Sequence, residues 1–363
     1  MQTVQLLKKL IPFRTLSHDH QANREALAWV KNEVKDLPVH LTDFSYNDFP
    51  SLLITTQPTK TPHLWLQAHL DVVDGSNEIF VPKEVGQRLY GRGAFDMKFA
   101  LATYLSILKE LKKDLKNYDF GLMITTDEEL GGRNGVGELL NQGYKSKVCV
   151  LPDGGENWHF QEWAKGLLHL KITSKGVSAH GAKPWKGKNA IGNLLEFLIQ
   201  LKKEFPQEPC ADKLHRHNTM TIGKINGGKS INQVSNHAEA HVDIRYVPEC
   251  TKKDIFKTLL SLKKDFKNIL IGEVASASSY KIKRGNLYLR LFAQIAKKYN
   301  TRTGFSFSHG SSDARYFLEK NIPTILLRPK GGNLHAENEW IDTKDLDKFH
   351  TVLKEFVEKT ARI

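Results

Sequence analysis

Two histidines and three acidic residues stand just past the ends of strand-like segments, where their side chains could bind metal ions. These residues are His69, Asp96, Glu129, Asp153 and His335. In open α/β sheets the ligand crevice lies outside the carboxyl ends of the strands, so ligands that are distant in sequence can converge there. Two imidazoles and three carboxylates, one of them shared, would satisfy a pair of zinc-like cations. The pattern predicts a hydrolase with two metal ions.

The segments around the first two of these residues each allow a second interpretation. A metal-bound imidazole usually donates its other N–H to a carboxylate, and Asp71, two residues after His69, is the natural partner. The alternative is an ordinary strand end with a polar turn. Asp96 stands at the start of a helical segment, after Gly91 and Gly93. It could bridge two cations, or it could simply cap that helix.

The segment TTDEELGG contains two adjacent glutamates, Glu128 and Glu129. Adjacent side chains cannot point the same way, so one can bind a metal while the other faces the substrate water. A glutamate beside a metal-bound water is the usual general base for amide hydrolysis. The alternative for this segment is the acidic start of a helix.

The elements that must position these residues follow an α/β pattern. Residues 1–36 read as helical, with Ser17 or Asp19 as a cap. From about 50 to 160 strands alternate with helices, which predicts a mostly parallel sheet with helices on both faces. Residues 167–279 resemble an antiparallel α+β insertion, with helices near 188–204 and 251–266. We therefore expect a catalytic domain of residues 1–166 and 280–363 and an inserted lid and dimerisation domain of residues 167–279.

Composition limits the class of protein. The 363 residues are 40% hydrophobic and 26% charged, which suits a soluble two-domain protein. The chain has no apolar run of about 20 residues for a membrane span, no signal-peptide pattern at its start, and three scattered cysteines that do not suggest a disulfide framework. A cytoplasmic protein is expected.

The net charge of +13 could indicate nucleic-acid binding. However, the lysines occur in segments such as LKELKKDLKN and LSLKKDFKN, where leucines recur at helical spacing. This spacing is typical of the solvated faces of amphipathic helices. Zinc-finger spacings and RNA-recognition signatures are absent from the sequence. We expect neither a nucleic acid nor a membrane as partner.

Eight segments, in order, resemble those of the di-zinc peptidase and deacylase family. They are HLDVV, GRGAFDMK, TTDEELGG, LPDGGE, SAHGAKPW, INQVSN–VDIRY, HGSSDARYF and GGNLHAENEW. That family contains carboxypeptidase G, succinyl-diaminopimelate desuccinylase, acetylornithine deacetylase, aminoacylase and carnosine-type dipeptidases. The resemblance covers nearly the whole chain, and the order and spacing of the segments make it specific although each segment alone is weak.

The resemblance implies a ligand set for two Zn²⁺ ions, with Co²⁺ or Mn²⁺ as possible substitutes. Asp96 would bridge the two ions. His69 and Asp153 would complete one site, and Glu129 and His335 the other. In the family an aspartate at the position of Asp153 accompanies aminoacylase- and dipeptidase-like members, whereas glutamate accompanies the desuccinylase, acetylornithine deacetylase and carboxypeptidase G types. This favours peptide or N-acyl-amino-acid substrates.

The resemblance also implies catalytic and substrate-binding residues. Glu128 matches the general base, and Asp71 the residue behind the first histidine. His180 matches a histidine that reaches the partner's active site across a homodimer and stabilises the developing oxyanion. The residues that match the substrate-binding positions are Arg245, Asn232, Gly331 and Gly332.

Simpler interpretations exist for several of these positions. Arg245 can grip a carboxylate through two hydrogen bonds, but it could also be an exposed strand arginine. His180 could be a turn histidine beside Gly181 and Pro184. Four other histidines are expected to be ordinary surface residues of strands or loops: His215, His217, His237 and His241.

The expected activity is hydrolysis of an amide bond in a small substrate with a free carboxylate. The enzyme would be an exopeptidase or an N-acyl-amino-acid deacylase in which a metal-activated water loses its proton to Glu128. The alternative from another class is a catalytically silent protein that binds a peptide or amino acid on the same fold. The presence of all five ligand candidates and the base in the sequence favours the enzyme.

Overall fold

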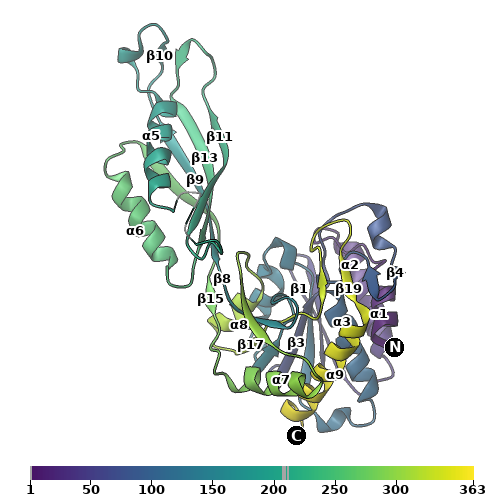
Figure 1. Cartoon of the computed structure of the whole chain (residues 1–363). Coiled ribbons are helices and arrows are strands. Elements are labelled where there is room, and N and C mark those ends of the chain that lie inside the picture. The colour runs from purple at the N-terminus through teal and green to yellow at the C-terminus, as the bar shows by residue number, and fades with distance from the viewer. Residues whose placement is uncertain (1, 207–209, 211) are drawn as a thin grey trace. The chain divides into compact units, whose positions relative to one another are not determined.

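The computed structural model of the protein describes residues 2–206, 210 and 212–363. The chain forms two units, shown in Figure 1. Unit 1 consists of Met1–Glu162, Ile282–Ser308 and Ser312–Ile363, and unit 2 of Trp163–Lys281 and His309–Ser311. Most of unit 2 is therefore one continuous insertion in the chain of unit 1.

A six-stranded sheet with the order β1-β2-β6-β3-β7-β17 lies at the centre of unit 1. Its strands are β1 (His40–Tyr46), β2 (Phe49–Thr55), β3 (Leu64–His69), β6 (Phe120–Thr125), β7 (Val148–Val150) and β17 (Thr324–Ile325). Strands β6, β3, β7 and β17 are parallel, whereas β1 and β2 form an antiparallel edge. The prediction of a mostly parallel sheet is confirmed. The hairpin partner β1 lacks an apolar pattern because it is exposed along most of its length.

Helices flank this sheet (Figure 1). They are α1 (Gln2–Leu10), α2 (His20–Val34), α3 (Lys98–Glu110), α4 (Glu138–Asn141), α7 (Leu287–Lys298), α8 (Ala314–Glu319) and α9 (Thr343–Thr360). Helix α3 is buried from Lys98 through Leu108 because it packs on β3 and also contacts α1, α2 and α9. The cap of α2 is Asp19, whose carboxylate accepts the N–H of Ala22.

Shorter elements complete unit 1. Single-turn helices are η1 (Asn77–Phe80), η2 (Leu115–Asn117), η3 (Glu128–Leu130) and the π-helical η4 (Arg133–Gly137). A small sheet contains β18 (Gly331–Gly332), β19 (Trp340–Asp342), β5 (Arg88–Tyr90) and β4 (Lys83–Val85). Residues 133–141 form one helical segment that consists of η4 followed by α4. Its first turn is widened where the carboxylate of Asp127 accepts the N–H groups of Asn134 and Gly135.

Unit 2 contains a four-stranded antiparallel sheet with the order β11-β13-β9-β14. Its strands are β9 (Gly166–Lys175), β11 (Thr219–Gly227), β13 (His237–Tyr246) and β14 (Ile269–Ala277). Buried residues alternate along β9 and β13, as expected for a sheet with one covered face. Helix α5 (Ala190–Lys203) packs on this face and contacts α6 (Lys252–Lys263) (Figure 1).

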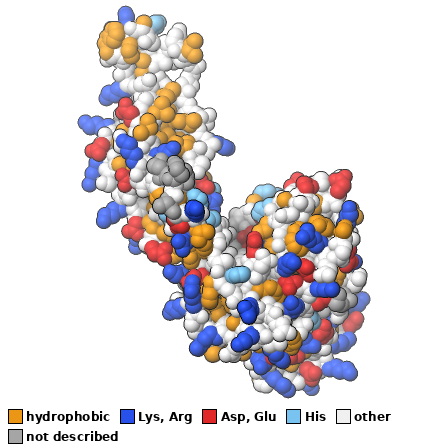
Figure 2. All heavy atoms as spheres, viewed as in Figure 1, with side chains coloured by type: hydrophobic (Ala, Val, Ile, Leu, Met, Phe, Trp, Pro, Cys, Tyr) orange, Lys and Arg blue, Asp and Glu red, His pale blue; other side chains and the backbone are white. Residues whose placement is uncertain are grey.

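Two short sheets and a single-turn helix complete the described fold. A two-stranded ribbon joins β10 (Ala179–His180) and β12 (Gln233–Val234), with η5 (Pro184–Lys186) between them in sequence. Strand β8 (His159–Ala164) pairs with β15 (Tyr280–Lys281), and β16 (Gly304–Ser308) belongs to the same sheet. On the face shown in Figure 2, lysines and arginines are interspersed with acidic side chains. Among the described helices, none combines the length and the apolar character that crossing a bilayer requires.

Candidate metal centre

His69 is the last residue of β3, and its imidazole is fully buried. Nδ1 lies 2.9 Å from the backbone oxygen of Asp71 and 3.5 Å from Oδ1 of the same residue. A proton on Nδ1 is therefore donated to Asp71, which leaves the lone pair of Nε2 facing Oδ1 of Asp96 at 3.4 Å. Nε2 has no hydrogen-bond partner among the residues that the structure describes. A buried lone pair beside a carboxylate suits a cation between them.

Asp96 lies between two imidazoles. Its Oδ2 is 3.1 Å from Nε2 of His335, and its Oδ1 faces His69. The capping interpretation is wrong, because the N-cap of α3 is Met97. Gly93 allows the close approach of this loop to the protein interior, since it has a φ of 82° and a Cβ there would lie 2.6 Å from the side chain of Lys98.

The five predicted ligands come together in two groups that share Asp96. One group contains His69, Asp96 and Asp153, and the other contains Asp96, Glu129 and His335. In each group the ligand atoms lie within 4.8 Å of one another. Each group offers one imidazole nitrogen and two carboxylate oxygens, a donor set that suits Zn²⁺, Co²⁺ or Mn²⁺. The residues present therefore fit a pair of bridged cations.

Asp71 organises the turn that carries the two glutamates. Its Oδ2 accepts the hydroxyl of Ser17 at 2.7 Å and the N–H of Glu129 at 3.1 Å, while Oδ1 accepts the N–H of Glu128 at 3.3 Å. Burial, and then the charge of Asp153, raise the pKa of Glu128 well above its ordinary value. A carboxylate with a raised pKa accepts a proton more readily, which suits a general base.

An arginine that the sequence analysis did not identify lies among the candidate ligands. Nη2 of the buried Arg328 is 3.0 Å from Oδ1 of Asp96 and 2.6 Å from Oδ1 of Asp153. Burial raises the pKa of Asp153 to about 6, against the opposing charge of Arg328. The guanidinium offsets part of the negative charge in this cluster. Arg328 directly follows an apolar segment of unit 1, so the strand-end pattern that indicated the other residues also applies to it.

Glu339 is a second residue that sequence reasoning missed. Its side chain is fully buried, and Oε1 accepts the backbone N–H groups of Phe95 at 2.8 Å and Asp96 at 3.0 Å. Oε2 accepts Nη1 of the buried Arg92 at 2.8 Å. Glu339 therefore fixes the backbone from which the shared carboxylate projects.

We expect Glu339→Gln to destabilise the protein by about 3–5 kcal/mol, the usual cost of breaking a buried ion pair by removing one partner. The amide can still accept hydrogen bonds from the backbone, but it leaves the charge of Arg92 uncompensated. Urea-induced unfolding measures the change. Glu337→Gln is the matched control, since Glu337 is exposed and bonds to Ser76, and we expect a change of less than about 1 kcal/mol. Equal effects of the two substitutions would contradict the assigned role of Glu339.

The remaining predicted residues lie partly in unit 2. The exposed His180 pairs with Gln233 across the two-stranded ribbon, and its Nδ1 accepts the N–H of Ala182 at 3.1 Å. Asn232 adjoins this pair, because its backbone oxygen accepts the N–H of Gly181 at 2.6 Å. The structure thus places His180 and Asn232 side by side within unit 2.

Arg245 and the glycine pair occupy other elements. On β13, the guanidinium of Arg245 donates from Nε to Oδ1 of Asp243 at 2.9 Å and from Nη2 to Oδ2 at 3.2 Å. Gly331 and Gly332 form β18 in unit 1. A Cβ on Gly331 would lie 2.3 Å from the ring of Phe95, so only glycine fits at this position.

Residues 65–359 match the family model "Peptidase family M20/M25/M40". The chain belongs to this family. The resemblance found in the sequence is therefore confirmed, and the protein is a metal-dependent hydrolase. Among curated members of the M20/M25/M40 family, the chain is 27% identical to a "Probable succinyl-diaminopimelate desuccinylase" of Staphylococcus epidermidis, over 98% of both chains. It is 24% identical to the succinyl-diaminopimelate desuccinylase of Nitratiruptor sp., over 98% of this chain and 99% of the relative.

Solved structures share the fold of this M20/M25/M40 member. Aminopeptidase PepT from Bacillus cereus superposes with a TM-score of 0.79 at 20% identity and covers 99% of this chain and 98% of its own. The M20 metallo-carboxypeptidase Sso-CP2 from Sulfolobus solfataricus superposes with a TM-score of 0.76 at 18% identity, and the match covers 99% of both chains. Human carnosine dipeptidase 1 superposes with a TM-score of 0.70 at 14% identity, and the match covers 99% of this chain and 95% of the dipeptidase chain. These similarities confirm the predicted fold class.

Proposed function

We propose that the protein hydrolyses an amide bond in a small substrate with a free carboxylate, using two metal ions held by His69, Asp96, Glu129, Asp153 and His335. The observation that carries this proposal is the shared position of Asp96 in two ligand groups. When bound, two Zn²⁺-like cations supply a Lewis acid for the scissile carbonyl and a water of lowered pKa.

The chemistry of the surrounding residues supports this function. Glu128 takes the proton of the attacking water and later returns it to the leaving amine, a role favoured by its raised pKa. Asp71 holds the turn that carries Glu128 and also receives the Nδ1 proton of His69. His180 donates to the developing oxyanion, and in a homodimer it would come from the partner subunit.

Arg245 and Asn232 bind the substrate carboxylate, with Gly331 and Gly332 lining the pocket. Asp243 occupies the edge of the guanidinium formed by Nε and Nη2. Because a guanidinium has five N–H donors in a planar fork, the other edge can still bind a substrate carboxylate through two hydrogen bonds. This arrangement suits a C-terminal peptide bond or an N-acyl amino acid.

Exposed apolar residues of unit 2 support the proposed homodimer. Leu195 and Ile199 on α5, and Ile222 and Ile225 on the edge strand β11, are 39–57% exposed. Figure 2 shows hydrophobic side chains gathered near α5. Exposed apolar residues beside an unpaired strand edge are typical of surfaces that a second chain covers.

The first experiment combines metal analysis with a substrate panel. The panel contains N-succinyl-diaminopimelate, dipeptides, tripeptides and N-acyl amino acids, since relatives and structural neighbours include desuccinylases and peptidases. We expect at least two metal ions per chain and a hydrolysis that a chelator abolishes and Zn²⁺ or Co²⁺ restores. Bound metal without hydrolysis of any panel member would favour the silent binding protein. Failure to bind metal after reconstitution would refute the proposal.

For any substrate that the panel identifies, we expect Arg245→Ala to raise KM about 10- to 100-fold with a smaller change in kcat, because a charge-assisted bidentate pair contributes roughly 1.5–3 kcal/mol. Arg245→Lys should recover only part of this loss, since an ammonium cannot form the planar pair. Steady-state kinetics measures both variants. Lys171→Ala, which removes another cation of the same sheet and its ion pair with Glu239, is the control. An unchanged KM in Arg245→Ala would exclude Arg245 from the substrate site.

A further inference from the structure

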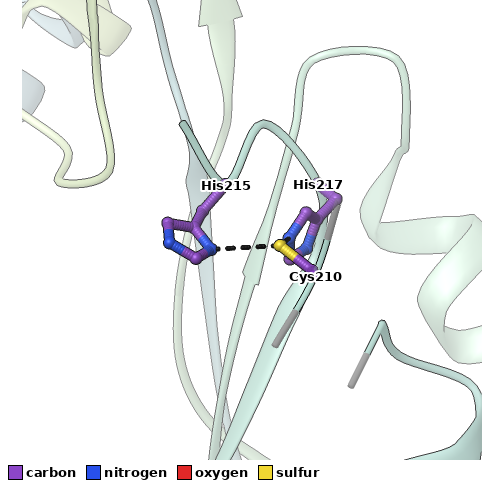
Figure 3. Close-up of side chains that lie close together, drawn as sticks. All are labelled: Cys210, His215 and His217. Carbon is purple, nitrogen blue, oxygen red and sulfur yellow. Dashed lines mark hydrogen bonds between the residues drawn. The ribbon is translucent and has the colours of Figure 1, made fainter. Parts of the chain in front are cut away.

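The loop between α5 and β11 brings a cysteine and two histidines of unit 2 together (Figure 3). Sγ of Cys210 lies 3.3 Å from Nδ1 of His215 and 3.2 Å from Nε2 of His217. These three ligand atoms all lie within 4.8 Å of one another. Cys210 and His217 are half-buried and His215 is exposed, so the cluster is open to solvent. The residues belong to neither of the two ligand groups described above.

Asp212 holds the turn of residues 212–216 through local hydrogen bonds. Its backbone oxygen accepts the N–H of His215 at 2.8 Å, in a turn where His215 has a φ of 49°. Its carboxylate accepts the N–H of Leu214 at 3.0 Å and the N–H of Arg216 at 2.9 Å. The hydrogen bond from the backbone N–H of Arg216 makes the largest contribution to lowering the pKa of Asp212 to about 2. The turn therefore presents His215 towards Cys210 through local hydrogen bonds.

The tautomer of His217 is set by its neighbour. Nδ1 lies 2.9 Å from the backbone oxygen of Asn218, so a neutral ring carries its proton on Nδ1 and its lone pair on Nε2. That lone pair faces Sγ of Cys210. A backbone carbonyl that orients the ring in this way is the usual support for a metal-binding histidine.

A single thiol proton cannot serve all the neighbours of Sγ. Besides the two imidazoles, the backbone oxygen of Asp212 lies 3.2 Å from Sγ of Cys210. A cation bound by a thiolate and two imidazole nitrogens would engage all three side chains at once, because each of the three ligand atoms would then direct a lone pair at it.

We propose that Cys210, His215 and His217 bind one Zn²⁺ ion, with solvent in the fourth position. With Zn–S near 2.3 Å and Zn–N near 2.0–2.1 Å, tetrahedral geometry separates S and N by about 3.5 Å. The observed separations need to increase by only a few tenths of an ångström. The thiolate makes this site softer than the carboxylate-rich centre of unit 1, so it favours Zn²⁺ over Mg²⁺ or Mn²⁺. The ion would link Cys210 to the segment that leads into β11, which begins two residues after His217.

Co²⁺ titration of the reduced, full-length protein tests this proposal. Thiolate ligands give a near-ultraviolet charge-transfer absorption with Co²⁺ that imidazole and carboxylate ligands do not give. We expect the amplitude of this absorption at saturation to correspond to one thiolate-bound Co²⁺ per chain, and we expect the absorption to disappear when Zn²⁺ is added. Cys210→Ser should abolish it. His217→Ala should weaken binding at least about tenfold, the loss already typical of residues that only support a metal ligand.

Cys250→Ser is the matched control, because Cys250 is a half-buried cysteine of the same unit whose thiol contacts Thr251. Cys250→Ser should leave the absorption unchanged. Asp96→Ala should also leave it unchanged, because this substitution removes a candidate ligand of the centre in unit 1. This outcome is therefore independent of the proposed hydrolase function. A wild-type protein without the absorption would overturn the proposal. So would an undiminished absorption in either Cys210→Ser or His217→Ala, each checked for a native circular dichroism spectrum.

Discussion

Glu128→Gln is expected to reduce hydrolysis by roughly 10²- to 10⁴-fold, the usual contribution of a general base. The amide keeps the shape of the side chain but cannot take the proton of the attacking water. Metal content should stay at the wild-type level, because Glu128 belongs to neither ligand group. The measurement is kcat on the best panel substrate together with elemental analysis of the same preparation.

Glu25→Gln serves as the control, since Glu25 is an exposed glutamate that bonds to Gln21 on α2. It should change neither quantity. Turnover near the wild-type level in Glu128→Gln would show that another group takes the proton. Loss of metal in this variant would instead assign Glu128 to the ligand set and leave the base unidentified.

Asp96→Ala is expected to remove both metal ions and to abolish hydrolysis. Asp96 supplies an oxygen to each of the two groups, so its loss leaves only two ligand residues on either side. It also leaves the buried guanidinium of Arg328 with Asp153 as its carboxylate partner, which favours an ion pair at the place where a cation would bind. Substitution of a bridging ligand should therefore remove more metal than substitution of a ligand to one ion.

Elemental analysis of Asp96→Ala and Asp153→Asn, each combined with Cys210→Ser so that the cluster of unit 2 contributes no ion, separates these cases. Asp153→Asn should lose binding at the group with His69 and retain it at the group with His335. Asp74→Ala is the control, because Asp74 is an exposed aspartate paired with Arg14. If Asp96→Ala kept one of the two ions at full occupancy, the carboxylate would not bridge them.

The candidate ligands could be found in the sequence because each is marked locally. His69 ends an apolar strand, Glu129 and Asp153 follow two others, and His335 comes after a glycine pair. The topology of an open α/β sheet then determines that such positions meet. The antiparallel α+β character of residues 167–279 was also expected from the sequence, and the structure shows buried residues alternating with more exposed ones along β9 and β13.

The partners of the supporting residues could not be read from the sequence, although Arg328 itself follows an apolar segment. Glu339 accepts the backbone N–H of Asp96, which lies 243 residues earlier in the chain. Arg328 donates to the carboxylate of Asp153, which lies 175 residues earlier. Ser17 was a candidate helix cap, yet its hydroxyl bonds to Asp71 while Asp19 caps the helix. A buried charge acquires its partner only when the chain has folded, so its sequence neighbours contain no information about that partner.

The sequence by itself determined the family, the fold class and the five ligand candidates, because these depend on residue types at recurring positions in strands and turns. The tertiary structure decided which buried charges surround the candidate ligands, such as Arg328 and Glu339, and that Cys210 meets His215 and His217. Those outcomes depend on atoms brought within hydrogen-bonding distance by packing and by single backbone conformations, such as the positive φ of His215. Short-range contacts of this kind follow from the folded geometry and not from the periodicity of the chain.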